Sequence, residues 1–154
     1  MRIYAIDPGT KQSGWVLYEA GAVLDSGVHD NHELLQWVKH GQGADLLAIE
    51  VMQASYGTVG KETIDTMMWA GRFWQAWADP EDVRLVTRQE AKAMICNGNT
   101  KASDSGVRLA LLDRFPATGG GKVPQVGTKA LPGPLYGVSS HAWAALAVAM
   151  TVAP

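Results

Sequence analysis

The stretch RIYAIDPGT, residues 2–10, decides the fold, and it has a partner in DLLAIE, residues 45–50. Each carries a short apolar run that ends in an acid, Asp7 in the first and Glu50 in the second. Short apolar runs of this kind, bounded by turn signals such as the Pro-Gly pair after Asp7, are typical of buried strands. In an open α/β sheet, ligands bind where the parallel strands end. If the two strands are parallel neighbours, their carboxylates meet at one edge of the sheet.

The rest of the chain predicts a mixed sheet covered by helices, which is an α/β domain. The expected order is three strands, a helix, a strand, a helix, a strand and then further helices. Residues 116–137 are rich in Gly and Pro and are expected to form a mobile loop. The other predicted strands span 14–18, 21–28 and 83–86. Two helices are predicted over 63–78 and 103–115. Three more are predicted from their N-caps: one capped by Asn31, one by Thr87 with Glu90 in a capping box, and the last by Ser139 or Ser140.

Length and composition bound the class of protein. The 154 residues, 47% of them hydrophobic, fit a single domain over 1–154. The one cysteine, Cys96, excludes an intramolecular disulfide framework and a Cys-based zinc site, and a reducing, cytoplasmic setting is the default. The sequence has no signal-peptide pattern at Met1, and the uncharged residues 130–154 are interrupted by Pro and Gly, so no membrane span is expected.

Charge is unevenly distributed along the chain. The net charge is −2, yet residues 1–83 hold five Lys and Arg against twelve Asp and Glu, whereas residues 84–129 hold eight against three. A basic middle segment behind an acidic first half suggests an edge that faces a polyanion such as DNA. The alternative is an accidental fluctuation among solvated surface charges. The candidate phosphate contacts are Arg84, Arg88, Lys92, Lys101, Arg108, Lys122 and Lys129.

The two strand-terminal acids are candidate metal ligands. Carboxylates at close quarters repel and need a cation between them, and oxygen ligands select Mg²⁺, for which Mn²⁺ can substitute. His141, in the first turn of the last helix, is a third candidate because a neutral imidazole binds metals. One turn later, Ala144 offers no ligand. The alternatives are an acid that points into water and a histidine that is satisfied within the fold.

These motifs, in this order, resemble those of RuvC-type Holliday junction resolvases. The resemblance rests on DPGT with Gly14-Trp15, on AIE at 48–50, on the loop and helix that contain NGNTKA at 97–102, and on SHAWAALA at 140–147. It covers nearly the whole chain. The GPLYG segment at 133–137 and the compact size are more similar to the phage-encoded branch than to the bacterial enzymes.

The resemblance implies an RNase H-like fold with a mixed five-stranded sheet, and a homodimer that nicks two strands of a four-way DNA junction with divalent metal. The metal-site positions of the family correspond to Asp7, Glu50, His141 and Ala144, with Asp7 expected to bridge two ions. Ala144 stands where the family pattern has Asp. We expect this chain to bind DNA and cleave it poorly, with Ala144 an engineered inactivating substitution; a naturally degenerate site is the alternative.

Two further positions depart from the family pattern. Asp104 stands where the bacterial family has a basic residue, although the preceding Lys101 can substitute. The aromatic wedge expected shortly after the second acid is replaced by Met52 and Gln53. Tyr56 is the nearest ring and could stack on a junction base, the alternative being an ordinary loop residue.

The expected dimer uses the helix at 63–78, whose Met and Trp side chains are too many for one inward face. Its Trp69 lies on a different side from Trp74, so part of this surface needs a partner, unless a loop of the same chain covers Trp69. Two other functions stay open: a nuclease for other branched DNA, and a non-catalytic junction-binding protein favoured by Ala144. An actin-like nucleotide-binding module needs a much longer chain.

Overall fold

The computed structural model describes residues 1–53 and 57–154, and a single mixed sheet organises them. Its five strands lie in the order β3-β2-β1-β4-β5. Strands β1, β2 and β3 form an antiparallel meander, whereas β4 and β5 run parallel to β1. The strands are β1 (Arg2–Asp7), β2 (Gln12–Glu19), β3 (Ala22–Asp30), β4 (Leu46–Val51) and β5 (Val83–Thr87). This confirms the predicted mixed five-stranded sheet.

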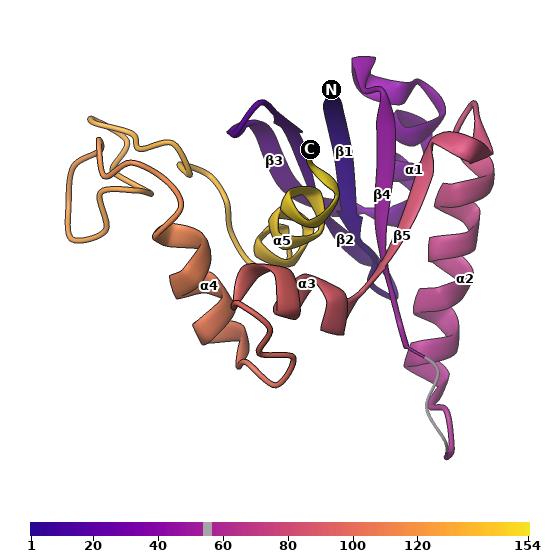
Figure 1. The fold of residues 1–154 in the computed structure, drawn as a ribbon. Coiled ribbons are helices and arrows are strands. Elements are labelled where there is room, and N and C mark those ends of the chain that lie inside the picture. Colours follow the sequence, from indigo (N-terminus) through magenta and orange to yellow (C-terminus); the bar gives the residue numbers. More distant parts are fainter. Residues whose placement is uncertain (54–56) are drawn as a thin grey trace.

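Helices cover both faces of the sheet (Figure 1). One face carries α1 (Asn31–Lys39) and α2 (Lys61–Ala76). The other carries α3 (Arg88–Ile95), α4 (Asp104–Leu112) and α5 (Ala142–Val152), with α5 packed directly on β1, β2 and β4. Two single-turn 3₁₀ helices, η1 (Gly41–Gly43) and η2 (Pro80–Asp82), precede β4 and β5. No helix in the described part of the chain is long and apolar enough to cross a bilayer.

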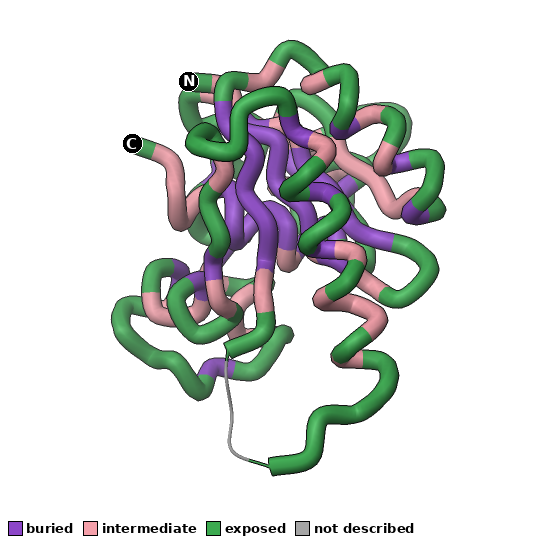
Figure 2. The backbone as a smooth tube through the Cα atoms, turned by 90° about the vertical axis from the view of Figure 1, so that its right-hand side faces the viewer, coloured by how far each residue is buried: buried purple, intermediate pink, exposed green. Residues whose placement is uncertain are grey.

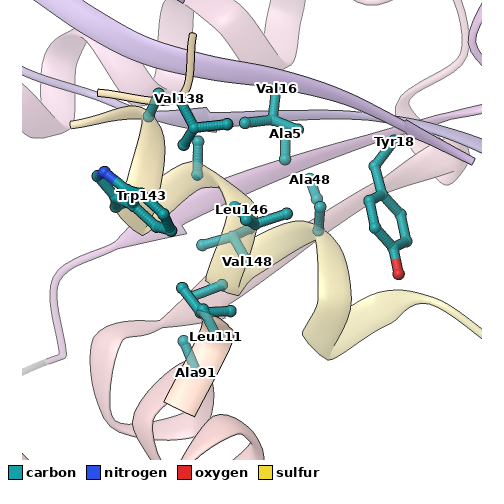
Figure 3. Packing of buried hydrophobic residues seen from close by; sticks show 14 of the residues in the cluster. Ala5, Val16, Tyr18, Ala48, Ala91, Leu111, Val138, Trp143, Leu146 and Val148 are labelled. Atoms are coloured by element: carbon teal, nitrogen blue, oxygen red, sulfur yellow. The ribbon is translucent and has the colours of Figure 1, made fainter. Parts of the chain in front are cut away.

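The sheet separates two hydrophobic clusters, because side chains alternate between the faces of each strand. Ile3 and Ala5 of β1 face α3, α4 and α5, whereas Tyr4 and Ile6 face α1 and α2. The strands accordingly form the buried centre of the molecule (Figure 2). Helix α5 is apolar almost throughout and buried along most of its length, as expected of a helix in the centre of a core (Figure 3).

The structure corrects several predicted helix ends. Asp30, not Asn31, caps α1, and its side chain accepts hydrogen bonds from the next turn. Helix α5 has no side-chain cap, so the predicted cap at Ser139 or Ser140 is wrong; His141 occupies the N-cap position. The predicted capping box of Thr87 and Glu90 is confirmed.

The Gly- and Pro-rich segment 116–137 contains no helix or strand, as predicted, but it closes on itself. The amide of Gly119 donates to the carbonyl of Pro124 at 2.8 Å, and that of Gly133 to Val126 at 3.0 Å. The chain crosses so closely that a Cβ on Gly133 would lie 2.3 Å from the Pro124 oxygen. The expectation of a mobile loop therefore gains no support from this hydrogen-bonded arrangement.

Candidate active site

The two strand-terminal acids lie side by side. Strands β1 and β4 are parallel neighbours with Ile6 opposite Ile49, so Asp7 and Glu50 follow at the same level of the sheet. Because side chains alternate between the two faces of a strand, Asp7 and Glu50 lie on the same face as Ala5 and Ala48, two residues earlier, which is the face that carries α5. They line one open cleft of about 960 Å³. The convergence predicted from the two apolar runs is confirmed.

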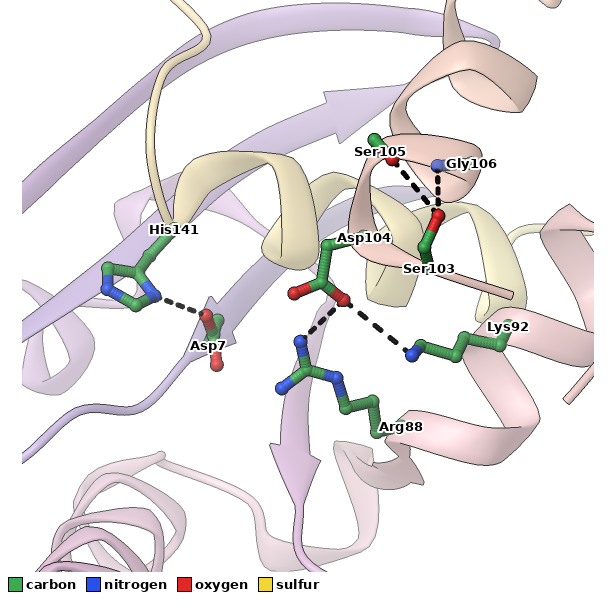
Figure 4. Close-up of polar contacts among 8 residues, drawn as sticks. All are labelled: Asp7, Arg88, Lys92, Ser103, Asp104, Ser105, Gly106 and His141. Carbon is green, nitrogen blue, oxygen red and sulfur yellow. Dashed lines mark hydrogen bonds and ion pairs between the residues drawn. The ribbon is translucent and has the colours of Figure 1, made fainter. Parts of the chain in front are cut away.

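His141 reaches the same cleft from the start of α5. Its Nδ1 lies 3.1 Å from Oδ2 of Asp7 (Figure 4). The approach depends on Gly14 of β2, because a Cβ there would lie 2.3 Å from the backbone carbonyl carbon of His141. The residue before it, Ser140, has a φ of 48°, which bends the chain into the helix. The structure thus unites Asp7, Glu50 and His141, and Ala144 lines the same cleft without contributing a ligand.

A buried polar network fixes the turn that follows Asp7. The Gly9 amide donates to Ser13 Oγ at 3.1 Å, and the Ser13 hydroxyl donates to Asn31 Oδ1 at 2.5 Å. Asn31 Nδ2 closes the ring by donating to the Gly9 carbonyl at 2.9 Å. Ser13 and Asn31 are fully buried, so each hydrogen bond is protected from water. Sequence reasoning missed this network because Asn31 also has the residue type of a helix cap.

Burial and mutual repulsion perturb the acid pair. Burial raises the pKa of Glu50 to about 7, and the neighbouring Asp7 charge adds to that effect. Burial also raises the pKa of Asp7, although the contact with His141 opposes the shift. The Arg88 guanidinium lowers the pKa of both acids. Two buried carboxylates that resist ionisation together form a place where a cation is favourable.

The donor set fits a single hard cation. Carboxylate oxygens are the ligands that Mg²⁺ and Mn²⁺ prefer, and one divalent ion would neutralise the two acids together. Within residues 1–53 and 57–154, no three His, Cys, Asp or Glu side chains lie close enough to one another to form a metal cluster. The acid pair is therefore the core of the candidate site, with His141 attached to it through Asp7.

Positive side chains from α3 and α4 line the same cleft. Arg88 Nη2 donates to Asp104 Oδ1 at 2.7 Å, and Lys92 Nζ lies 3.6 Å from the same oxygen (Figure 4). Arg108 lies over the ring of Trp143, 4.7 Å from its centroid, and also lines the cleft. Three of the predicted phosphate contacts thus gather beside the acids.

The other candidates lie elsewhere. Arg84 donates to the backbone carbonyls of Glu81 and Val83, and Lys101, Lys122 and Lys129 do not line the cleft. Tyr56 lies outside the described residues. Sequence reasoning also missed Asp104 as the partner of Arg88 and Lys92. A signal was available, since Asp104 follows the N-cap Ser103 and is one of three acids in the basic segment.

Comparison with known proteins agrees with this architecture. No protein-family model and no curated protein matches the sequence. A solved structure of Thermus thermophilus RuvC in complex with a Holliday junction substrate matches with a TM-score of 0.67 at 20% identity, over 98% of this chain and 92% of that one. The chain has the RuvC fold. A second Thermus thermophilus RuvC structure matches with a TM-score of 0.63 at 19% identity over the same shares. The predicted RNase H-like fold is thereby confirmed.

Proposed function

We propose that this chain is a metal-dependent endodeoxyribonuclease that resolves four-way (Holliday) junctions by paired nicks. One observation carries the proposal: on a RuvC fold, the acid pair of Asp7 and Glu50 and a group of cationic side chains line one cleft. A phosphodiesterase site needs acids that hold a divalent ion and, near them, cationic side chains that hold the phosphates. The solved RuvC complex with a Holliday junction supports the choice of branched DNA.

Each group of residues in the cleft has a role in the proposed reaction. Asp7 and Glu50 would hold Mg²⁺ or Mn²⁺, with His141 as the third candidate ligand. When bound, the ion polarises the phosphate and makes water a better nucleophile. The water oxygen bonds to phosphorus, one ester P–O bond breaks, and the departing oxygen receives a proton while the attacking water loses one. Lys92 and Arg108 bind phosphate oxygens of the backbone, and Asp7 orients the imidazole of His141 through their hydrogen bond.

Ala144 makes this a slow enzyme in our proposal. It lines the cleft near His141, where the family pattern has a carboxylate, and an alanine leaves the site with less negative charge to hold cations. We retain the idea that Ala144 is an inactivating substitution, which the coding sequence of the native gene decides. An alanine in that gene rules out engineering and indicates a naturally reduced site.

A homodimer completes the proposal, because two symmetric sites explain paired nicks. Helix α2 exposes Ile64, Met68 and Trp74, which are 49%, 64% and 42% accessible. The expectation for Trp69 is corrected: it packs against His32 and Phe73 of the same chain. We also retain in the proposal a phage origin and action in the host cell cytoplasm, where the free thiol of Cys96 would stay reduced.

Two observations favour other functions. Ala144 favours a junction-binding protein without activity. Met52 and Gln53, which stand where the family has an aromatic wedge, leave open a nuclease for branched DNA other than the four-way junction. Forks, flaps and nicked duplexes belong in the same assay for that reason.

The test compares this chain with its Ala144→Asp variant on a synthetic four-way junction, with Mg²⁺ or Mn²⁺. Binding is measured separately by gel shift in EDTA. We expect both proteins to bind and the Asp variant to nick much faster. If both bind and neither nicks any branched substrate, the nuclease proposal is wrong and the binding-protein alternative holds. If neither binds branched DNA more tightly than linear duplex, both proposals are wrong.

A further inference from the structure

Arg88 lines the cleft that holds the acid pair. Arg88 begins α3 directly after Thr87, and Thr87 pairs with Val51, the residue after Glu50. The adjacent strands therefore bring the base of Arg88 to the edge of the sheet where Glu50 and Asp7 end. Its charge lowers the pKa of both acids, while the charge of its partner Asp104 raises the pKa of both, and Arg88 and Asp104 line the same cleft as the acids.

Asp104 fixes the position of that guanidinium. Its Oδ1 accepts from Arg88 at 2.7 Å and lies 3.6 Å from the ammonium of Lys92. Asp104 is the first residue of α4, where the Ser103 side chain caps the helix by accepting from the Gly106 amide at 3.1 Å. A carboxylate at the start of a helix is stabilised by the helix dipole. Asp104 is thus anchored on one side and holds two cations on the other, which leaves it poorly placed to bind a metal ion itself.

The count of charges limits how many divalent ions the site accepts. At the ends of β1 and β4, the two carboxylates of Asp7 and Glu50 balance a single divalent ion, and Ala144 contributes no third carboxylate there. Asp30, Glu62 and Asp104 also line the cleft, but within the described residues none of them joins the pair in a cluster of three possible metal ligands. A second divalent ion would lack ligands and would be repelled by Arg88, because like charges at short range in a partly buried cleft interact strongly. A guanidinium, however, supplies fixed positive charge and paired N–H donors that match phosphate oxygens.

We infer that this site binds a single divalent ion at Asp7 and Glu50, and that Arg88, positioned by Asp104, supplies the second positive charge to the phosphate that is cleaved. The inference rests on the proposed nuclease function and specifies how its site works. It assigns Arg88 to the reacting phosphate and makes Asp104 a positioning residue. Lys92, which shares Asp104, remains a contact to the DNA backbone.

The first test measures Mn²⁺ binding without DNA, by electron paramagnetic resonance of free Mn²⁺. This chain should bind one ion with micromolar-to-millimolar affinity set by the acids, and Arg88→Gln should bind Mn²⁺ about tenfold more tightly because a repelling charge is gone. Arg88→Lys keeps the charge and should bind like the parent chain. Arg72→Gln is the matched control, because Arg72 lies over Trp69 on α2, away from the cleft. Two ions bound per parent chain, or an unchanged affinity in Arg88→Gln, would overturn the inference.

The second test separates binding from chemistry on the junction. Arg88→Gln should lower kcat by at least tenfold and change KM little, because Lys92 and Arg108 still hold the backbone, and Arg88→Lys should recover part of kcat. Asp104→Asn should also lower kcat, because it removes the partner that positions Arg88. A loss confined to KM would make Arg88 an ordinary backbone contact and refute its role. If no junction is cleaved by any variant, the nuclease proposal fails, while the Mn²⁺ titration still decides whether Arg88 replaces a second ion.

Discussion

From the raised pKa of Glu50, we predict that its ionised side chain destabilises the metal-free protein. Its side chain has a pKa of about 7 in the folded chain, against 4.5 ordinarily. At 1.36 kcal/mol per pKa unit, the difference corresponds to about 3 kcal/mol. Because the pKa is raised, the folded chain binds the proton more tightly than the unfolded chain. The stability that Glu50 contributes is therefore fully present below about pH 4.5, falls as the pH rises to about 7, and is lost above that pH.

Replacing Glu50 with Gln removes the ionisable group while keeping its shape. In EDTA at pH 8, Glu50→Gln should raise the free energy of unfolding by about 2–3 kcal/mol, whereas at pH 5 the gain should be under about 1 kcal/mol. Urea denaturation followed by tryptophan fluorescence measures both values, provided that unfolding is two-state. Millimolar Mg²⁺ should stabilise the parent at pH 8 and leave the variant unchanged, because the ion binds the ionised pair.

The matched control is Glu81→Gln, in the exposed 3₁₀ turn η2 far from the cleft. It should change stability little, and equally at both pH values. The reasoning is refuted if Glu50→Gln is no more stable than the parent at pH 8, or if its gain is the same at pH 5. Either result would mean that Glu50 is ionised in the folded chain without strain, so the acid pair would not call for a cation.

Three further outcomes follow from the contacts around the cleft. Gly14→Ala should destabilise the chain by about 1–3 kcal/mol in urea and slow cleavage, because its Cβ would meet the His141 backbone at 2.3 Å; unaltered activity would mean that the His141 approach is unimportant. Ser13→Ala should cost about 1–3 kcal/mol, since it leaves the Gly9 amide and Asn31 Oδ1 without their partner; a neutral effect in the same assay contradicts the network. Met68→Glu should shift sedimentation from dimer to monomer while leaving the unfolding midpoint of the monomer unchanged; a dimer that persists places the interface elsewhere.

Sequence reasoning succeeded where the signal was local. The apolar runs before Asp7 and Glu50 predicted two strands, and the acids at their ends could be placed because parallel strands finish at the same edge. The capping box of Thr87 and Glu90 was likewise visible, since both partners lie within one helical turn. A last helix beginning near Ser139 or Ser140 was predicted, and α5 is found at Ala142–Val152 with His141 at its start, in contact with Asp7.

Sequence reasoning failed where the contact partner of a residue is remote in the chain. Asn31 has the chemistry of a helix cap, yet tertiary packing turns its side chain inward to Ser13 and the Gly9 carbonyl. Gly14 belongs to a motif, but its steric purpose appears only when the start of α5 is seen against it. The pairing of Asp104 with Arg88 spans sixteen residues and a loop, so periodicity could not reveal it, although Asp104 is one of three acids in the basic segment.

Two of the departures from the expected family pattern, Ala144 and Asp104, lie in the same cleft. The acid missing at Ala144 of α5 and the acid gained at Asp104 of α4 both line it. They are not equivalent, because Asp104 forms ion pairs with Arg88 and Lys92. In our proposal, this chain therefore has a negative charge at a position that holds a guanidinium and none at the position of Ala144. In such a site, the fixed positive charge of Arg88 would take the place of a second divalent ion. Its activity would depend less on the metal concentration and more on the geometry that Asp104 maintains.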